Sequence, residues 1–213
     1  GFKEFDPARA PEYGYQHPNV ITAMEFERMI NPSGPTEGKV LLKNGRRPRS
    51  VAIIHCVGSR NEKYHEYCSR ACCMYSLKLA QLVHEYVDAE VDEIYRDIRS
   101  FGKGYEEFFN RTKQTGVNFY HGQVNSVAQQ NGHLHIEWDE AFYQQPDNLD
   151  VDMVILATGF EPQADAAQLA QTFGISRSPD GFFLERHPKL GPIETRSEGI
   201  FLAGACQSPK DIP

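Results

Sequence analysis

The chain has 213 residues, of which 40% are hydrophobic and 24% charged, a composition that predicts a globular protein with a sizeable core. Its formal net charge of −7 excludes a dedicated nucleic-acid-binding protein, because such a protein needs a basic surface against the phosphates. The apolar runs 51–54 and 153–157 are too short to cross a bilayer, so no transmembrane segment is expected.

In chain order, residues 1–48 are rich in Pro, Gly and Tyr and predict a connector with one short helix over 21–30, capped by Asn19 or Thr22. The β-branched run 50–55 then predicts a buried parallel strand. A helical period follows from 69 to about 87. These segments together predict one strand-helix unit of a parallel sheet.

The next segments are a strand over 93–98 and a helix over 105–114, which Gly116 is expected to close at the C′ position. A short strand over 117–120 and a hairpin of 123–128 with 134–138 come next, and the hairpin is expected to turn at Asn131-Gly132. Two more strands, 151–157 and 199–203, each run into a glycine turn. This order predicts an α/β fold with a Rossmann-like, nucleotide-binding-type domain in three layers, including a β-hairpin or meander.

Four of the five cysteines, Cys56, Cys68, Cys72 and Cys73, are crowded into 18 residues. The N-terminal residues show no signal peptide and no initiator methionine, so we expect a cytoplasmic protein cut from a longer chain, with reduced thiols. Cys56 follows a predicted parallel strand. If a helix begins at Ser69, Cys68 lies near its N-cap and Cys72 in its first turn, where the helix N-terminus favours thiolates. The cysteines are therefore candidate metal ligands.

Two kinds of metal site fit this spacing. Zinc is often held by four cysteines, or by three cysteines and a histidine, and His55 and His65 lie nearby. Adjacent cysteines fit two corners of one small tetrahedron poorly, whereas a cubane spreads its ligands over a larger body, so a [4Fe-4S] cluster is favoured. A zinc-stapled docking domain stays the second hypothesis, and buried packing of the thiols is the unreactive alternative.

The turn after the strand 50–55 bears on a third hypothesis, a pyridine-nucleotide-binding oxidoreductase domain. A dinucleotide site needs a G-x-G-x-x-G turn there, so that the backbone can approach the pyrophosphate. The turn from Cys56 to Asn61 has one glycine. Binding of NAD(P)H at this position is therefore not expected in the standard manner.

Several strings closely resemble the A-type subunit of heterodisulfide reductase, and the resemblance spans nearly the whole chain. They include Val57 to Arg60, Tyr67 to Tyr75 with Lys78, Ala157 to Phe160, and Gly204 to Pro213. The related quinone-interacting oxidoreductase subunits of sulfate reducers share this kinship, and the motifs do not decide between the branches. The resemblance implies a fragment of a thioredoxin-reductase-like flavoprotein core that passes electrons between FAD and a [4Fe-4S] cluster.

In that family the cluster occupies the domain that would otherwise hold a pyridine nucleotide. The resemblance therefore implies that residues 49–157 form this domain, between a connector with part of the FAD domain (1–48) and a segment that returns into the FAD domain (158–213). It also implies that Lys78 faces the flavin and acts in catalysis. The implied residues are the cluster ligands Cys56, Cys68, Cys72 and Cys73, and the FAD contacts Ala157, Thr158, Gly159, Gly204, Ala205 and Cys206.

Cys206 is treated as a packed thiol near FAD, where backbone amides would make the contact. The glycine-rich loop that binds FAD pyrophosphate is not found in this sequence, so the fragment alone is expected to hold no stoichiometric FAD. The expected partners are other reductase subunits and electron donor and acceptor proteins, through which the protein could associate with a membrane. A homodimer is left open, and nucleic acid is not expected.

Overall fold

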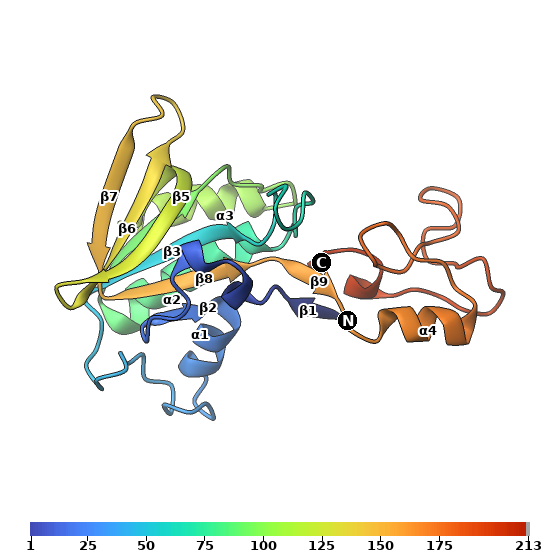
Figure 1. Ribbon diagram of the computed structural model, residues 1–213, viewed down its shortest axis with the longest axis horizontal. Coiled ribbons are helices and arrows are strands. Elements are labelled where there is room, and N and C mark those ends of the chain that lie inside the picture. Colours follow the sequence, from blue (N-terminus) through green and yellow to red (C-terminus); the bar gives the residue numbers. More distant parts are fainter. Residues whose placement is uncertain (212–213) are drawn as a thin grey trace.

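The computed structural model describes residues 1–211, and a seven-stranded sheet is its largest element (Figure 1). The strand order is β2-β8-β3-β4-β5-β6-β7, with parallel pairing from β2 to β5 and antiparallel pairing from β5 to β7. The strands are β2 (Val20–Thr22), β3 (Ser50–Val57), β4 (Glu90–Tyr95), β5 (Asn118–Gln130), β6 (His133–Glu140), β7 (Pro146–Val151) and β8 (Met153–Thr158).

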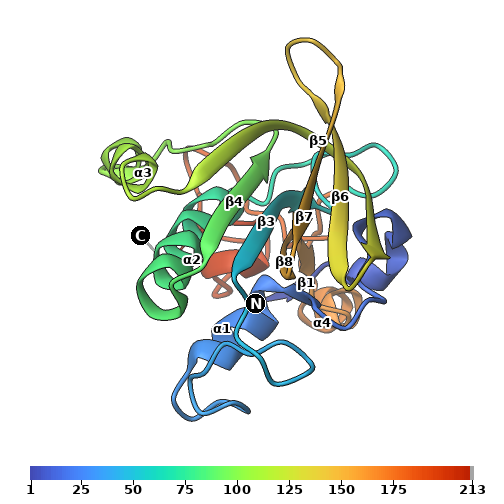
Figure 2. The ribbon, with the colours of Figure 1, turned by 90° about the vertical axis from the view of Figure 1, so that its left-hand side faces the viewer.

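The central strand β3 is buried on both faces because successive side chains point to opposite sides of the sheet. On one side, Ile53 packs against α1 (Ala23–Ile30) and α2 (Cys72–Val87). On the other side, Ile54 packs with Trp138 of β6. The curled strands β5 to β7 therefore cover the face where a doubly wound fold would place helices (Figure 2). The third helix, α3 (Tyr105–Lys113), precedes β5.

A smaller lobe follows the sheet and lies to the right in Figure 1. It is reached through β9 (Phe160–Pro162), which pairs antiparallel with β1 (Phe2–Glu4). The lobe contains α4 (Ala166–Phe173) and the 3₁₀ helix η3 (Gly204–Cys206), around a small apolar cluster that includes Leu202. Two further 3₁₀ turns, η1 (Pro7–Arg9) and η2 (Pro11–Tyr13), link β1 to the sheet.

The predicted α/β, Rossmann-like class and its meander are confirmed, as are two local signals. Thr22 caps α1 in a capping box with Glu25, in which each side chain binds the other residue's backbone N–H. The hairpin turns at Asn131-Gly132, whose φ angles are 49° and 87°. Because both values are positive, this is the turn that a tight two-residue hairpin needs.

Several predicted boundaries were wrong. The helix expected from Ser69 begins at Cys72, and the strand expected over 93–98 runs over Glu90–Tyr95. The helix α3 ends with Gln114 as its C-cap, so Gly116 lies one position beyond the predicted C′ place. The strand expected over 199–203 is only an isolated bridge between Glu194 and Phe201. Phe201 is 63% exposed, so this segment lacks the burial of a central strand.

Two strand assignments failed for identifiable physical reasons. The segments 117–120 and 123–128 form one strand, β5, because Gly122 continues it instead of ending it. A Cβ at Gly122 would lie 2.6 Å from Trp138 Cδ1, so glycine is needed there to make room for the indole. The edge strand β7 was not predicted, because it is mostly polar and exposed and alternates only at Leu149 and Val151.

Candidate functional site

The four clustered cysteines lie at the carboxyl end of the parallel strands. Cys56 is the next-to-last residue of β3, and Cys72 and Cys73 are the first two residues of α2. Cys68 lies in the loop between these elements and is not at the helix N-cap, which is Ala71. Cys68 is half-buried, whereas the other three are buried, and all are free thiols. Ligands of α/β folds bind at this edge of the sheet.

The backbone at Cys56 is unusual because its φ is +60°, in the left-handed region that non-glycine residues rarely adopt. Arg60 and Arg70 in the following loop also have positive φ angles, of 56° and 60°. Such conformations cost on the order of 1–3 kcal/mol each and are concentrated at binding sites. The end of β3 and the loop after it therefore contain three residues in conformations of raised backbone energy.

Neighbouring cysteines contribute to the pKa values of Cys56 and Cys72. Burial, with smaller contributions from the charges of Cys73 and Cys68, raises the pKa of Cys56 to about 11, although Arg60 acts to lower it. Burial also raises the pKa of Cys72, and the charges of the other three cysteines add to the effect. Within residues 1–211, no three His, Cys, Asp or Glu side chains form a group that could hold a metal ion.

Hydrogen-bond donors are directed at these thiols. The backbone N–H of Arg70 donates to Cys68 Sγ at 3.3 Å, and the Arg60 side chain is close enough to Cys56 to act to lower its pKa. The first turn of α2 contains no acidic residue, and its N-cap makes no side-chain hydrogen bond, so neither offsets the positive end of the helix dipole near Cys72 and Cys73. Donors of this kind stabilise thiolates, which are the form that binds metal.

A buried acid-base pair lies behind Cys73. His55 Nε2 is 2.8 Å from Glu93 Oε2, and the two side chains are 1% and 0% exposed. Burial raises the pKa of Cys73, but the neighbouring His55 ring and its charge outweigh burial, so the pKa is lowered overall. Among the described residues, His55 Nδ1 and Glu93 Oε1 have no hydrogen-bond partner. His55 therefore offers a polar ring atom to the cysteine site.

The two histidines named for a zinc site lie in different environments. His55 is next to Cys73 and is paired with Glu93 in the interior. His65 Nε2 lies 2.6 Å from Glu161 Oε1, so its ring is engaged by that carboxylate at the start of the smaller lobe. The sequence suggested neither carboxylate pairing, because the partners are 38 and 96 residues away.

An apolar pocket with a volume of about 390 Å³ is lined by Thr158, whose carbonyl contacts Cys72. Its walls come from β1, α1, α2, β9 and the end of β8, and Thr158 is one of the predicted cofactor contacts. The lining residues are Phe2, Glu4, Ala23, Met24, Glu27, Tyr75, Thr158 and Phe160. Lys78 does not line the pocket but lies 3.0 Å from Glu27 Oε1, with 55% of its side chain exposed.

The Thr158 carbonyl joins the pocket to the cysteine site. It accepts hydrogen bonds from Cys72 Sγ at 3.6 Å and from the Tyr75 hydroxyl at 3.2 Å. Gly159 follows, and its N–H donates to Val57 O at 2.8 Å. A Cβ on Gly159 would lie 3.1 Å from Ser69 Oγ, so a small residue is favoured where the chain leaves the sheet.

The remaining predicted FAD contacts are in different places. Ala157 is fully buried inside β8. Gly204, Ala205 and Cys206 form η3 in the smaller lobe, where Cys206 lines a separate pocket of about 180 Å³ with Phe183. The structure therefore does not bring η3 into the pocket beside Thr158, and the predicted FAD contacts of η3 stay a prediction.

The fold as a whole resembles thioredoxin reductases of known structure. The Lactococcus lactis enzyme matches with a TM-score of 0.61 and 13% identity, over 100% of this chain and 57% of that one. The T. acidophilum enzyme matches with a TM-score of 0.57 and 13% identity, over 99% and 56%. The likeness defines the class of protein: the chain has the Rossmann-like FAD/NAD(P)-binding fold of thioredoxin reductases.

Curated sequences narrow this class to one family. The chain is 48% identical to the A-type subunit of the H(2):CoB-CoM heterodisulfide,ferredoxin reductase of Methanothermobacter marburgensis, over 100% of the chain and 33% of the relative. It is 46% identical to the second A-type iron-sulfur subunit of the CoB-CoM heterodisulfide reductase of Methanopyrus kandleri, over 100% and 34%. Family profiles give no match. The chain is a homologue of the A-type subunits of heterodisulfide reductases, which the motifs predicted, and spans about a third of their length.

No helix within residues 1–211 combines the length and the apolar character that a membrane span requires.

Proposed function

We propose that the chain is the part of a heterodisulfide-reductase-like iron-sulfur flavoprotein in which electrons pass between FAD and a [4Fe-4S] cluster. One observation carries the proposal: the carbonyl of Thr158, a residue that lines the apolar pocket, is in contact with Cys72 Sγ at 3.6 Å. A flavin in the pocket and a cluster on the cysteines would thus be separated by little more than one residue. Such proximity is what electron transfer between two carriers needs.

Cys56, Cys68, Cys72 and Cys73 are the proposed cluster ligands. Their support is the chemistry of the donor set, since four free thiols lie at one end of the sheet and the pKa values of Cys56 and Cys72 are raised in part by the neighbouring cysteines. The side chain of Arg60, the N–H of Arg70 and the ring atom His55 Nδ1 offer further polar contacts to a group with negative charge. These ligands would come from β3, its loop and α2.

The apolar pocket is the proposed place of the flavin ring, with Phe2, Phe160, Tyr75 and Met24 as its walls. FAD, when bound, exchanges electrons singly or in pairs, and the cluster carries them one at a time. Lys78 is proposed to face the flavin after releasing Glu27, so that its positive charge favours the reduced ring. We further propose a cytoplasmic protein whose partners are other reductase subunits and electron donor or acceptor proteins.

Metal analysis of the 213-residue chain, purified and reconstituted without oxygen, tests the proposal. We expect about four iron and four sulfide per chain, with broad visible absorption that reduction bleaches. Cys72→Ser should lose most of the iron, whereas the matched variant Cys206→Ser should keep it. One zinc per chain and no iron would instead establish the zinc-stapled docking domain. Saturable NAD(P)H binding without iron would establish the pyridine-nucleotide hypothesis.

A further inference from the structure

Cys68 is the only one of the four clustered cysteines that lies outside a regular element. Cys56 belongs to β3, and Cys72 and Cys73 belong to α2, so their backbone positions are fixed by the sheet and the helix. Cys68 lies in the loop 58–71 and is half-buried. Its position therefore depends on whatever holds this loop.

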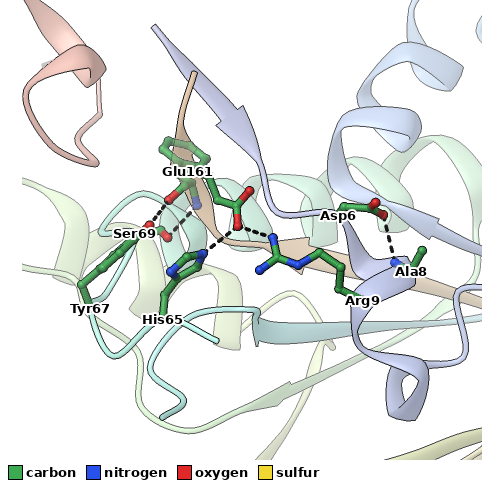
Figure 3. A network of polar contacts seen from close by, with 8 residues as sticks. Asp6, Ala8, Arg9, His65, Tyr67, Ser69 and Glu161 are labelled. Carbon is green, nitrogen blue, oxygen red and sulfur yellow. Dashed lines mark hydrogen bonds and ion pairs between the residues drawn. The ribbon is translucent and has the colours of Figure 1, made fainter. Parts of the chain in front are cut away.

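The two neighbours of Cys68 in sequence both bind the backbone of Phe160 in β9 (Figure 3). The Tyr67 hydroxyl donates to Phe160 O at 2.8 Å, and the Phe160 N–H donates to Ser69 Oγ at 2.8 Å. Ser69 is 0% exposed, so its hydroxyl meets this N–H away from water. The residues before and after Cys68 are thus both hydrogen-bonded to the same residue of β9.

A carboxylate next to Phe160 strengthens the same attachment. Glu161 Oε1 lies 2.6 Å from His65 Nε2 and accepts a hydrogen bond from Arg9 Nη1, also at 2.6 Å. The Glu161 side chain is 11% exposed, so the pair with His65 is shielded from solvent. Figure 3 shows Arg9, His65 and Glu161 in this arrangement. Backbone bonds from Arg60 N to Tyr67 O and from Asn61 N to His65 O close the loop on itself.

We propose that Tyr67, Ser69 and Glu161 are positioning residues that hold the loop of Cys68 against β9, and so keep this thiol at the same end of the sheet as the other three cysteines before the metal arrives. The inference rests on the proposed function only in taking Cys68 as a ligand. It explains why a cysteine on a loop could serve beside three cysteines on rigid elements, since a site is selective when its supporting contacts fix the ligand in advance. Phe160 and Glu161 of β9 provide the fixed contacts, and the loop 58–71 is held in place by bonding to them.

Alkylation of Cys68 in the metal-free chain, followed by mass spectrometry of each cysteine peptide, tests the proposal directly. Tyr67→Phe removes one hydroxyl, and Glu161→Gln removes the charge, with little change in size. We expect each variant to speed alkylation of Cys68 about fivefold, which corresponds to one lost hydrogen bond. The rate at Cys206 should not change, and the melting temperature of Tyr67→Phe should stay close to that of the unaltered chain.

Tyr105→Phe is the matched control, because its hydroxyl binds Asp211, which lies outside the loop. It should leave the Cys68 rate unaltered. Equal Cys68 rates in the unaltered chain, Tyr67→Phe and Glu161→Gln would overturn the proposal. If one variant fails to fold, the other still decides.

Cluster loss to a chelator, measured on the reconstituted chain, separates this inference from the proposed function. With the cluster in place, Tyr67→Phe should lose iron about fivefold faster than the unaltered chain. If the unaltered chain takes up no iron, the proposed function fails, while the alkylation rates still judge the positioning role. If iron is taken up and both rates are the same in the variants, only the positioning role fails.

Discussion

The Cys72 thiol and the Thr158 carbonyl are 3.6 Å apart, and they connect the first turn of α2 to the end of β8. This contact makes the wall of the apolar pocket and the wall of the cysteine site the same piece of backbone. A substitution in the apolar pocket should therefore also affect the cysteine site, and the reverse. Variants with matched controls can separate such functional effects from effects on folding.

Replacement of Lys78 by alanine should alter the flavin but hardly alter folding. The pair of Lys78 with Glu27 is solvent-exposed, with side chains 55% and 42% accessible, so its loss should cost less than about 1 kcal/mol of unfolding free energy. In the full-length protein, Lys78→Ala should lower the flavin reduction potential, because a positive charge near the reduced ring is removed. Potentiometric titration checks this, and an unchanged potential would refute the flavin-facing role.

Replacing one member of the buried His55–Glu93 pair should lower the unfolding free energy much more than replacing both members with apolar residues. Glu93→Leu leaves His55 buried without its partner and should lower the unfolding free energy of the metal-free chain by about 3–5 kcal/mol. The double variant His55→Leu/Glu93→Leu should regain much of this loss. Urea unfolding measures both, with Glu27→Leu as the exposed control. Additive losses in the double variant would show that the two residues do not act as a pair.

Gly58 should be intolerant of a side chain for two reasons that a control can separate. Its φ is +76°, and a Cβ would lie 2.2 Å from Cγ of the fully buried Phe5. Gly45 has a similar φ of +79° but no atom within 4 Å of an added Cβ. Gly45→Ala should cost about 1 kcal/mol from backbone strain, and Gly58→Ala about 1–3 kcal/mol more from overpacking. If urea unfolding shows the same loss of unfolding free energy for Gly58→Ala and Gly45→Ala, the Phe5 ring can move aside without an energetic cost.

The carboxylate of Glu161 should make the unfolding free energy depend on pH in the acidic range. Burial raises its pKa, but hydrogen bonds from His65 and Arg9 outweigh burial and hold the pKa below its ordinary value of 4.5. A group with a depressed pKa stabilises the fold above its unfolded pKa and loses this contribution as the pH falls through the folded value. Unfolding free energy should thus fall below pH 4.5, and less steeply in Glu161→Gln. The exposed Glu62→Gln should follow the unaltered chain.

The sequence predicted the features that depend on short-range chemistry. Thr22 with Glu25 marked a helix start, Asn131-Gly132 marked a tight turn, and β-branched runs marked β3 and β8. The cysteine spacing pointed to the right edge of the sheet, although the start of α2 was placed three residues too early. These signals are local, because capping, turn geometry and side-chain alternation act over a few residues.

The contacts that hold the site together were beyond such reasoning. Glu161 meets Arg9 across 152 residues of sequence, and Thr158 meets Cys72 across 86. Gly122 was taken for a break because its neighbour Trp138 could not be known from the sequence. The buried charge of Asp92 concealed the true start of β4, since a fully buried strand is expected to be apolar.

The left-handed backbone at Cys56 shows a compromise between folding and function. Glycine would adopt φ +60° without strain, whereas a cysteine there costs on the order of 1–3 kcal/mol. Stability alone would favour glycine here, so a side chain at this point of the strand is present at a cost to the fold. If Cys56 binds metal as proposed, substitution by glycine should relieve the backbone while removing the ligand.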